Sequence, residues 1–255
     1  MSYRERKHRI MNLLRQQGSV RVAELAPLLD VSDETVRKDL DALSDEGLLR
    51  RTHGGAIPLL DVQSLTPHLE RENANAELKQ AIAQAALQHI QPHDTIALDG
   101  STTVSFLTKL IPDMPLTVVT NSMHVAFELS SRDHINVISV GGMLLRQSHS
   151  FHGSMTERIL REYHVGKAFL SCTGLHPDRG FSDSNEAHAS VKKQMIGIAD
   201  DVFFLIDSSK MGIRDLVRIA PSDSPATVIT DSGTRPEWVE LFDETPIEFM
   251  RAEPQ

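Results

Sequence analysis

The stretch Val31–Leu40 reads VSDETVRKDL, and it decides how the first sixty residues fold. Ser32 or Asp33 can cap the N-terminus of a helix, and Glu34 in its first turn suits the positive end of the helix dipole. Apolar residues then recur at the spacing of a buried helix face, at Val36, Leu40 and Leu43. The pattern predicts a helix that buries one face and leaves its first turns open on the other.

The open face of this predicted helix carries Thr35, Arg37, Lys38 and Asp41. A helix that reads DNA needs this arrangement, because its N-terminal residues reach the base edges in the major groove. Arg37 or Lys38 could pair with guanine edges or hold phosphates, and the sequence does not separate these roles. The plainer alternative is a solvated helix face in an ordinary small bundle.

The flanking segments favour the DNA-binding interpretation. Residues 4–17 and 22–29 have helical apolar spacing, and the second helix must be short because it contains Pro27. Residues 48–58, LLRRTHGGAIP, predict two strands around a Gly-Gly turn, with two arginines and a histidine beside the turn. A helix-turn-helix followed directly by a basic hairpin indicates a winged helix-turn-helix domain over residues 1–58. The residues that we predict to contact double-stranded operator DNA are Ser32, Glu34, Thr35, Arg37, Lys38, Arg50, Arg51, Thr52, His53 and Gly54.

Length, composition and charge are consistent with two domains of a globular protein. The chain has 255 residues, 40% of them hydrophobic and 24% charged, and a formal net charge of −9. Residues 1–58 hold ten Lys/Arg against nine Asp/Glu, so the negative charge lies in the remainder. No apolar run is long enough to span a membrane, no secretory signal is recognisable, and the single Cys172 cannot form an internal disulfide. We therefore expect a cytoplasmic protein without a membrane partner.

The remainder of the chain alternates between strand and helix patterns. Residues 59–76 predict an interdomain linker, and residues 77–255 a second domain whose first helix begins near Glu77. Short runs rich in β-formers alternate with helical segments, which predicts a mostly parallel α/β sheet covered on both faces. The predicted strands are 95–98, 116–119, 135–140, 167–171, 202–206, 227–229 and 247–250. The helices between them are 104–110, 124–131, 155–163, 185–199 and 237–242.

Small and polar residues follow most of the predicted inner strands. Ligands of open α/β sheets bind beyond the carboxyl ends of the strands, so these loops should converge on one crevice. A Gly-Ser-Thr-Thr sequence that opens a helix provides backbone N–H groups and hydroxyls for a phosphate, and Lys210 can add a positive charge. Each such loop alone is more often a simple helix cap. The residues that the strand ends contribute are Asp99, Gly100, Ser101, Thr102, Thr103, Asn121, Ser122, Gly141, Gly142, Gly174 and Lys210.

Together these motifs resemble the DeoR-type repressors of bacterial sugar catabolism. The resemblance rests on Val31–Leu40, on the wing at residues 50–56, and on LDGSTT, TNS, GG and DSSKMG in the second domain, at residues 98–103, 120–122, 141–142 and 207–212. It also covers residues 180–195, which add Glu186 and Lys192 to the expected effector site. The resemblance implies a Rossmann-like effector domain similar in fold to phosphosugar isomerases, a small phosphorylated metabolite as effector, and a structural role for Asp39.

Two positions depart from the family pattern, and other functions stay open. His176 and His188 stand where family members often carry acids, so an acid–base role in the pocket is doubtful. One alternative is a phosphosugar isomerase with an accessory DNA-binding head, using Asp99, Glu186 and a lysine. A metal sensor is a weaker alternative, suggested by the pair His149 and His152. No dinucleotide-binding or ATP-binding motif occurs, so we expect no cofactor. We also expect no catalytic residue and no metal, and the effector is the one small ligand that we expect.

One winged helix reads only half of a symmetric operator, so we expect a homodimer or homotetramer. We hypothesise that the ligand changes the linker at residues 59–76 and thereby the spacing of the DNA-binding heads. The sequence does not identify the effector, the operon, or whether the ligand induces or co-represses.

Overall fold

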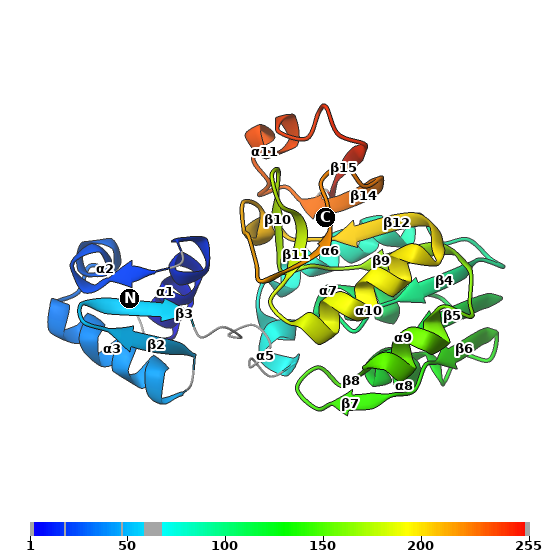
Figure 1. Ribbon diagram of the computed structural model, residues 1–255, viewed down its shortest axis with the longest axis horizontal. Coiled ribbons are helices and arrows are strands. Elements are labelled where there is room, and N and C mark those ends of the chain that lie inside the picture. The colour runs from blue at the N-terminus through cyan, green and yellow to red at the C-terminus, as the bar shows by residue number, and fades with distance from the viewer. Residues whose placement is uncertain (1–2, 18, 47, 59–67, 253–255) are drawn as a thin grey trace. The chain divides into compact units, whose positions relative to one another are not determined.

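The computed structural model describes residues 3–17, 19–46, 48–58 and 68–252. The chain divides into two compact units, residues 1–66 and 67–255, and Figure 1 shows the elements of both. No helix within the described ranges is long and apolar enough to cross a membrane.

The first unit is a three-helix domain with a small antiparallel sheet, as the sequence predicts. Its helices are α1 (Tyr3–Gln17), α2 (Val22–Leu29) and α3 (Asp33–Asp45), and its strands are β1 (Val20–Arg21), β2 (Leu49–Thr52) and β3 (Gly55–Pro58), in the order β1-β3-β2. Ser32 caps α3, and Val36, Leu40 and Leu43 are fully buried. Strands β2 and β3 form the predicted wing directly after α3.

The second unit is built on a seven-stranded sheet in which every neighbouring pair is parallel. All seven predicted strands belong to it, in the order β15-β14-β12-β9-β4-β5-β6. Their bounds are β4 (Thr95–Leu98), β5 (Leu116–Thr120), β6 (Ile135–Ser139), β9 (Val165–Leu170), β12 (Ala199–Leu205), β14 (Ala226–Asp231) and β15 (Ile247–Ala252). The prediction of a mostly parallel α/β sheet is therefore confirmed.

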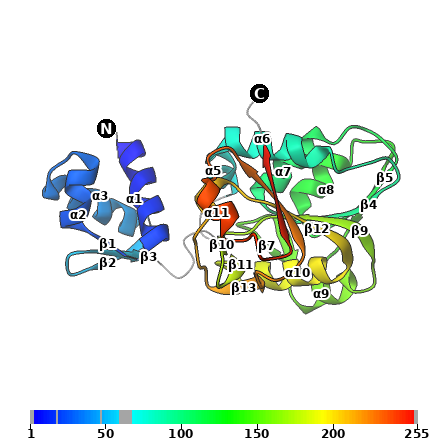
Figure 2. The same cartoon turned by 90° about the horizontal axis from the view of Figure 1, so that it is seen from above.

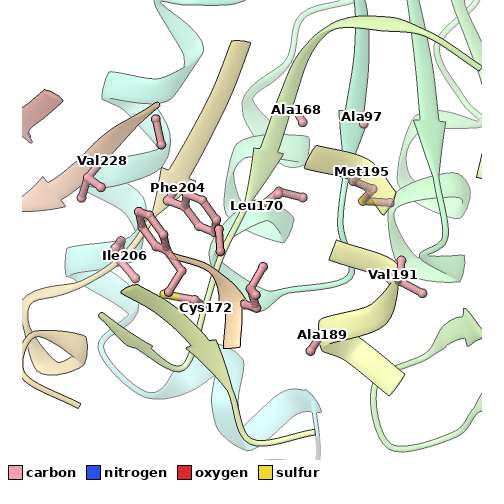
Figure 3. Packing of buried hydrophobic residues seen from close by; sticks show 14 of the residues in the cluster. Ala97, Ala168, Leu170, Cys172, Ala189, Val191, Met195, Phe204, Ile206 and Val228 are labelled. Atoms are coloured by element: carbon pink, nitrogen blue, oxygen red, sulfur yellow. The ribbon is translucent and has the colours of Figure 1, made fainter. Parts of the chain in front are cut away.

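Helices cover both faces of this sheet (Figure 2). Helices α6 (Ala76–Leu87), α7 (Thr102–Leu110) and α8 (Met123–Leu129) pack on one face and share one apolar cluster. Helices α9 (Ser154–Leu160) and α10 (Glu186–Gly197) pack on the other and share a second cluster. Figure 3 shows part of the second cluster, with Leu170 and Phe204 on strands β9 and β12 and Met195 on α10. Helix α11 (Pro236–Glu240) lies between β14 and β15 along the chain.

Several short elements are absent from the sequence prediction. A hairpin joins β7 (Met143–Leu145) to β8 (Ser150–His152), and a second small sheet has the order β10-β11-β13, with β10 (Gly174–His176), β11 (Gly180–Asp183) and β13 (Val217–Ala220). A 3₁₀ turn spans Ser208–Lys210. Strands of three or four residues contain too few positions to establish a period of two.

Part of the predicted linker is helical. Helix α5 (His68–Asn73) occupies its second half, and this helix belongs to the second unit. Residues 59–67 of the predicted linker lie outside the described residues. A six-residue helix is shorter than two turns, so it leaves no apolar repeat in the sequence.

Candidate DNA interface and effector site

The first turn of α3 is held by its own polar side chains. The Ser32 hydroxyl accepts from the Thr35 backbone N–H at 3.2 Å and lies 3.0 Å from the Thr35 hydroxyl. Glu34 and Lys38 form an exposed pair one turn apart at 3.8 Å, and Arg37 is exposed. Ser32 and Thr35 therefore fix the start of the helix, while Arg37 and Lys38 are open to a partner.

The wing turn is fastened to the second helix. The Gly54 carbonyl accepts from the Val22 backbone N–H at 2.9 Å, at the first residue of α2. A Cβ at Gly55 would lie 1.8 Å from the Val20 carbonyl oxygen, so this close strand crossing requires glycine. The turn residues Thr52, His53 and Gly54 remain exposed. The wing is therefore positioned by backbone contacts that leave its tip available.

Arg51 differs from the other predicted DNA contacts. Its Nε donates to Asp41 of α3 at 2.7 Å, and its Nη1 donates to the Gly55 carbonyl at 2.5 Å. The guanidinium thus joins the recognition helix to the wing, and the sequence prediction of a DNA contact misses this structural role. Arg50, the neighbouring residue, is exposed.

A hollow on this unit brings the predicted contacts together. It lies between the start of α2, the start of α3 and the wing. Its lining residues are Val22, Ala23, Asp33, Arg37, Arg51, Thr52, His53 and Gly54. Five of these are on the list of predicted DNA contacts, so the fold gathers residues from the recognition helix and the wing on one surface.

The strand ends of the second unit also converge, as predicted. Strands β12, β9, β4 and β5 are consecutive neighbours in the sheet, so the residues that follow them lie at one edge. Asp99, directly after β4, is almost completely buried. Its Oδ1 accepts from the Ser101 N–H at 2.9 Å, and its Oδ2 accepts from the Ser171 N–H at 3.2 Å, after β9. Asp99 therefore ties two adjacent strand ends together.

Two helices begin at this edge with serine caps. The Ser101 hydroxyl accepts from the Val104 N–H at 3.4 Å, and the Ser122 hydroxyl accepts from the Val125 N–H at 3.3 Å. Thr102 and Thr103 are buried in the first turn of α7. The simple capping interpretation therefore holds for both serine side chains, while the helix dipoles still favour an anion at this edge.

Lys192 lies in a buried network of charges. Its Nζ donates to Asp183 Oδ2 at 2.5 Å and lies 3.6 Å from Asp99 Oδ2. Burial opposes ionisation of both partners, but Lys192, together with His188, holds the pKa of Asp183 well below its ordinary value. Asp183 and Asp99 in turn raise the pKa of Lys192. Lys192 is thus a fixed cation at the strand edge, already paired within the chain.

A second charged group surrounds Asp207, after β12. Burial opposes its ionisation, but Lys210 and hydrogen bonds from Ser209 hold the pKa of Asp207 below its ordinary value. Asn75, at the start of α6, donates its amide to Asp207 Oδ1 at 3.2 Å. Burial lowers the pKa of Lys79 to about 8, and its ammonium donates to the carbonyls of Arg71 and Ala74.

Four predicted site residues have other surroundings. Glu186 is exposed in the first turn of α10, so the structure does not bring it into the buried network. The Gly141 carbonyl accepts from the Thr156 hydroxyl at 2.8 Å, and a Cβ at Gly142 would lie 2.0 Å from that hydroxyl oxygen. A Cβ at Gly174 would lie 2.6 Å from the Ile213 carbonyl oxygen. Close packing accounts for Gly142 and Gly174, whereas a Cβ at Gly141 would meet nothing within 4 Å.

Sequence reasoning did not assign three polar residues of the β7–β8 hairpin to the site. Ser148, Ser150 and His152 are buried and form a chain, with 2.7 Å between the two hydroxyls and 2.8 Å from Ser150 Oγ to His152 Nε2. A Cβ at Gly100 would lie 3.0 Å from that of Ser150, so these polar residues reach the loop that follows β4. Ser148 lies in the turn before β8, and Ser150 and His152 are two residues apart on β8, so the sequence contains too short a pattern to identify them.

Neither metal nor isomerase chemistry gains support from this arrangement. His149 is exposed while His152 is buried, and the described residues contain no group of three or more His, Cys, Asp or Glu side chains suited to a metal ion. Cys172 is buried, which raises the pKa of its thiol to about 12. The carboxylates Asp99 and Asp183 are both engaged with Lys192.

Comparisons with known proteins match both units. A family model described as DeoR-like helix-turn-helix domain matches residues 6–59, and one described as DeoR C terminal sensor domain matches residues 74–232. The chain is 43% identical over 243 residues to the HTH-type transcriptional regulator YulB of Bacillus subtilis, covering 95% of this chain and 94% of that protein.

Two further relatives have names that state an operon. The L-fucose operon activator of Haemophilus influenzae is 36% identical, over 91% of this chain and 92% of that protein. The putative aga operon transcriptional repressor of Escherichia coli O157:H7 is 34% identical, over 96% of this chain and 93% of that protein. Among solved structures, ribose 5-phosphate isomerase A from Methanocaldococcus jannaschii overlays with a TM-score of 0.40 and 16% identity, over 54% of this chain and 55% of that one. A TM-score of this size supports no statement about function.

Proposed function

Because this chain belongs to the DeoR family of transcriptional regulators, we propose that it controls a carbohydrate-utilisation operon in response to a phosphorylated sugar. Like its relatives, which are named as transcriptional regulators, it is a DNA-binding regulator and not an enzyme. The observation that carries the proposal is the convergence of strand ends, two capped helix N-termini and buried charges at one edge of the parallel sheet.

The sheet edge beyond β4 and β5 suits a phosphate. Helices α7 and α8 begin at adjacent strand ends, so the positive ends of two helix dipoles meet there. Lys210, in the 3₁₀ turn after β12, adds a cation near the same edge. We assign the phosphate to this edge, beside Gly100 and the first turn of α7, because the Ser101 N–H already donates to Asp99. No cofactor other than this effector is part of the proposal.

The relatives suggest the ligand class and leave the direction of control open. One is named for an L-fucose operon and is an activator, and the other is named as a repressor. We propose repression that the sugar phosphate relieves. Because repression and activation both need specific DNA binding, transcription in vitro with and without ligand decides the direction.

We further propose that the protein acts as a homo-oligomer in the cytoplasm. One recognition helix covers a half-site, and two heads on a symmetric operator raise both affinity and specificity. Sedimentation equilibrium of the full chain measures the state. A monomer at micromolar concentration, with and without operator DNA, would contradict this part of the proposal.

The contacts of Asn75 suggest how the ligand acts on α5, the first described helix of the second unit. Asn75 joins the start of α6 to Asp207 and Ser209 at the sheet edge. Lys79 fastens the end of α5 to α6 through the Arg71 carbonyl. A ligand that displaces the Asp207 loop would therefore shift α5, the first described element after residues 59–67.

Fluorescence anisotropy tests the proposal. The full chain is titrated onto DNA from upstream of its own gene and onto random-sequence DNA, across a salt series, with glucose 6-phosphate, fructose 6-phosphate or ribose 5-phosphate. We expect specific binding that one compound weakens. Specific binding that no compound changes would leave the DNA reader in place and refute the sugar-phosphate sensor.

A further inference from the structure

His188 lies at the centre of the buried polar contacts of the effector site. Its Nδ1 is 3.7 Å from Asp183 Oδ1, and its ring centroid is 4.8 Å from that of His152. The side chain of His188 is 13% exposed, on the first turn of α10. Sequence reasoning named His188 only as a departure from the family pattern, and the structure places it inside the site.

The contacts around His188 form a closed circuit of neighbouring residues. From His188 they run through Asp183 and Lys192 to Asp99 on one side. On the other side they run through His152 to Ser150, which approaches Gly100, the residue after Asp99. This circuit of residues connects α10, the β7–β8 hairpin and the end of β4, so His188 belongs to the proposed phosphosugar site.

Two buried polar atoms in this region have no hydrogen-bond partner within the described residues. They are His188 Nε2 and Asn121 Oδ1. Asn121 is 2% exposed, and its Nδ2 donates to the Phe151 carbonyl at 2.9 Å, on the strand that carries His152. A buried polar atom without a partner costs free energy, so each atom implies an occupant that can pair with it.

Asn121 Oδ1 is a hydrogen-bond acceptor, because the amide nitrogen of this side chain faces a carbonyl. His188 Nε2 accepts in the neutral imidazole and donates in the imidazolium, and the Asp183 carboxylate near Nδ1 favours a proton on Nδ1 in both forms. Ionised phosphate and carboxylate groups only accept, so they cannot pair with Asn121 Oδ1. A hydroxyl both donates and accepts, so it can pair with Asn121 Oδ1 and with His188 Nε2 in either form.

We infer that His188 and Asn121 bind hydroxyl groups of the effector's carbon chain and that His188 is a specificity-determining residue. This rests on the proposed function. The crevice is then divided, with donors at the helix N-termini for the phosphate and with His188 Nε2 and Asn121 Oδ1 for hydroxyls. Sites built to hydrogen-bond a hydroxyl discriminate strongly against the analogue that lacks it, because the site's buried polar group is then left unpaired.

Calorimetric titration of the full chain tests this. The probes are glucose 6-phosphate, fructose 6-phosphate and ribose 5-phosphate, each with its monodeoxy analogues. The variants are His188→Phe, which keeps the ring and removes Nε2, His188→Gln, which keeps an acceptor oxygen, and Asn121→Ala. His89→Phe is the matched control, because His89 is also partly buried and its ring lies 4.8 Å from that of Phe203.

We expect the unaltered chain to bind at least one deoxy analogue about tenfold more weakly than its parent sugar phosphate. His188→Phe should weaken the parent about tenfold and leave that analogue unchanged, so that the discrimination disappears. His188→Gln should restore part of it, and His89→Phe should change nothing. If His188→Phe does not fold, Asn121→Ala tests independently whether the discrimination between the parent compound and its deoxy analogues is lost.

The inference is overturned if the unaltered chain binds every deoxy analogue as well as its parent. It is also overturned if His188→Phe weakens parent and analogue equally. Both results leave the sugar-phosphate sensor intact. If none of the three parent compounds binds the unaltered chain, the proposed function itself fails and the inference fails with it.

Discussion

Arg6 of α1 and Asp39 of α3 form a pair with two hydrogen bonds, 2.6 Å from Nε to Oδ2 and 3.0 Å from Nη2 to Oδ1. Asp39 is 5% exposed and belongs to the buried residues of α3, with Val36, Leu40 and Leu43. The fork of the guanidinium fixes both distance and orientation between the two helices. The structural role that the family resemblance implies for Asp39 is therefore present in the fold.

Asp39→Ala should destabilise the DNA-binding unit by about 2 to 3 kcal/mol, because Arg6 loses two charged hydrogen bonds at a largely buried position. Hydrogen exchange of the α3 backbone amides in the full chain measures the loss. Lys38→Ala is the control, because the pair of Lys38 with Glu34 is largely exposed and should change stability little. Equal exchange rates in both variants would contradict the prediction.

If Arg37 contacts a base, Arg37→Ala should weaken specific DNA binding by about 1 to 3 kcal/mol. If Arg37 holds a phosphate, the variant should bind all DNA sequences more weakly to the same extent, and its affinity should depend less steeply on salt concentration. Its side chain is exposed, so thermal unfolding should be unchanged. Arg51→Ala should reduce both binding and stability, because Arg51 also joins Asp41 to the wing. Anisotropy and calorimetry on the two variants distinguish these outcomes. A destabilised Arg37→Ala variant would refute the assignment.

The first unit and the parallel sheet could be predicted from sequence because their signals are long. Thirteen residues of α3 contain a complete apolar stripe, and the seven strands are buried runs separated by helices. The partner of Arg51 could not be predicted, since composition shows a charge near a turn but not that the chain brings Asp41 beside it. Arg50 and Arg51 are therefore equivalent in the sequence pattern, but in the fold Arg50 is exposed and Arg51 is bonded to Asp41.

Asn75→Ala should uncouple ligand binding from DNA release. The variant loses the hydrogen bond from the Asn75 amide to Asp207, but keeps the strand-end residues that we assign to the ligand. Calorimetry should show sugar-phosphate affinity within about threefold of the unaltered chain. Anisotropy should show that the same ligand no longer weakens operator binding. Normal release by the variant would show that the signal does not pass through Asn75.

The buried neutral state of His152 should make the second unit acid-sensitive. Burial, with a smaller effect of His188, lowers the pKa of His152 from 6.5 to about 4. The unfolded chain then binds more protons between these values, so the stabilisation is complete above about pH 6.5 and is lost as the pH falls towards 4. The loss should reach about 3 kcal/mol.

Urea unfolding at several pH values, followed by the fluorescence of Trp238, measures this dependence. Trp238 is the only tryptophan and belongs to the second unit. His152→Asn should flatten the dependence between pH 6.5 and 4, while His164→Gln, at an exposed position, should not. Parallel curves for His152→Asn and the unaltered chain would contradict the assignment.

The candidate effector site was predictable only where its residues follow long strands. Asp99, Ser101 and Ser122 come directly after buried runs, so their convergence follows from the parallel order. His188 and Ser150 reach the site through α10 and a hairpin with three-residue strands, and their meeting depends on tertiary packing. Glu186 shows the converse, because it is exposed although His188, two residues further along α10, lies beside the buried Asp183.

The apolar clusters of the two units share no residue: one runs from Ile10 to Ala56, and the other two begin at Ile82 or later. Substitutions that tune operator recognition therefore need not disturb the packing that supports the ligand crevice. Recombination near residues 59–67 would exchange heads without cutting through any of these clusters. A lineage built this way can acquire a new operator and a new ligand in separate evolutionary events.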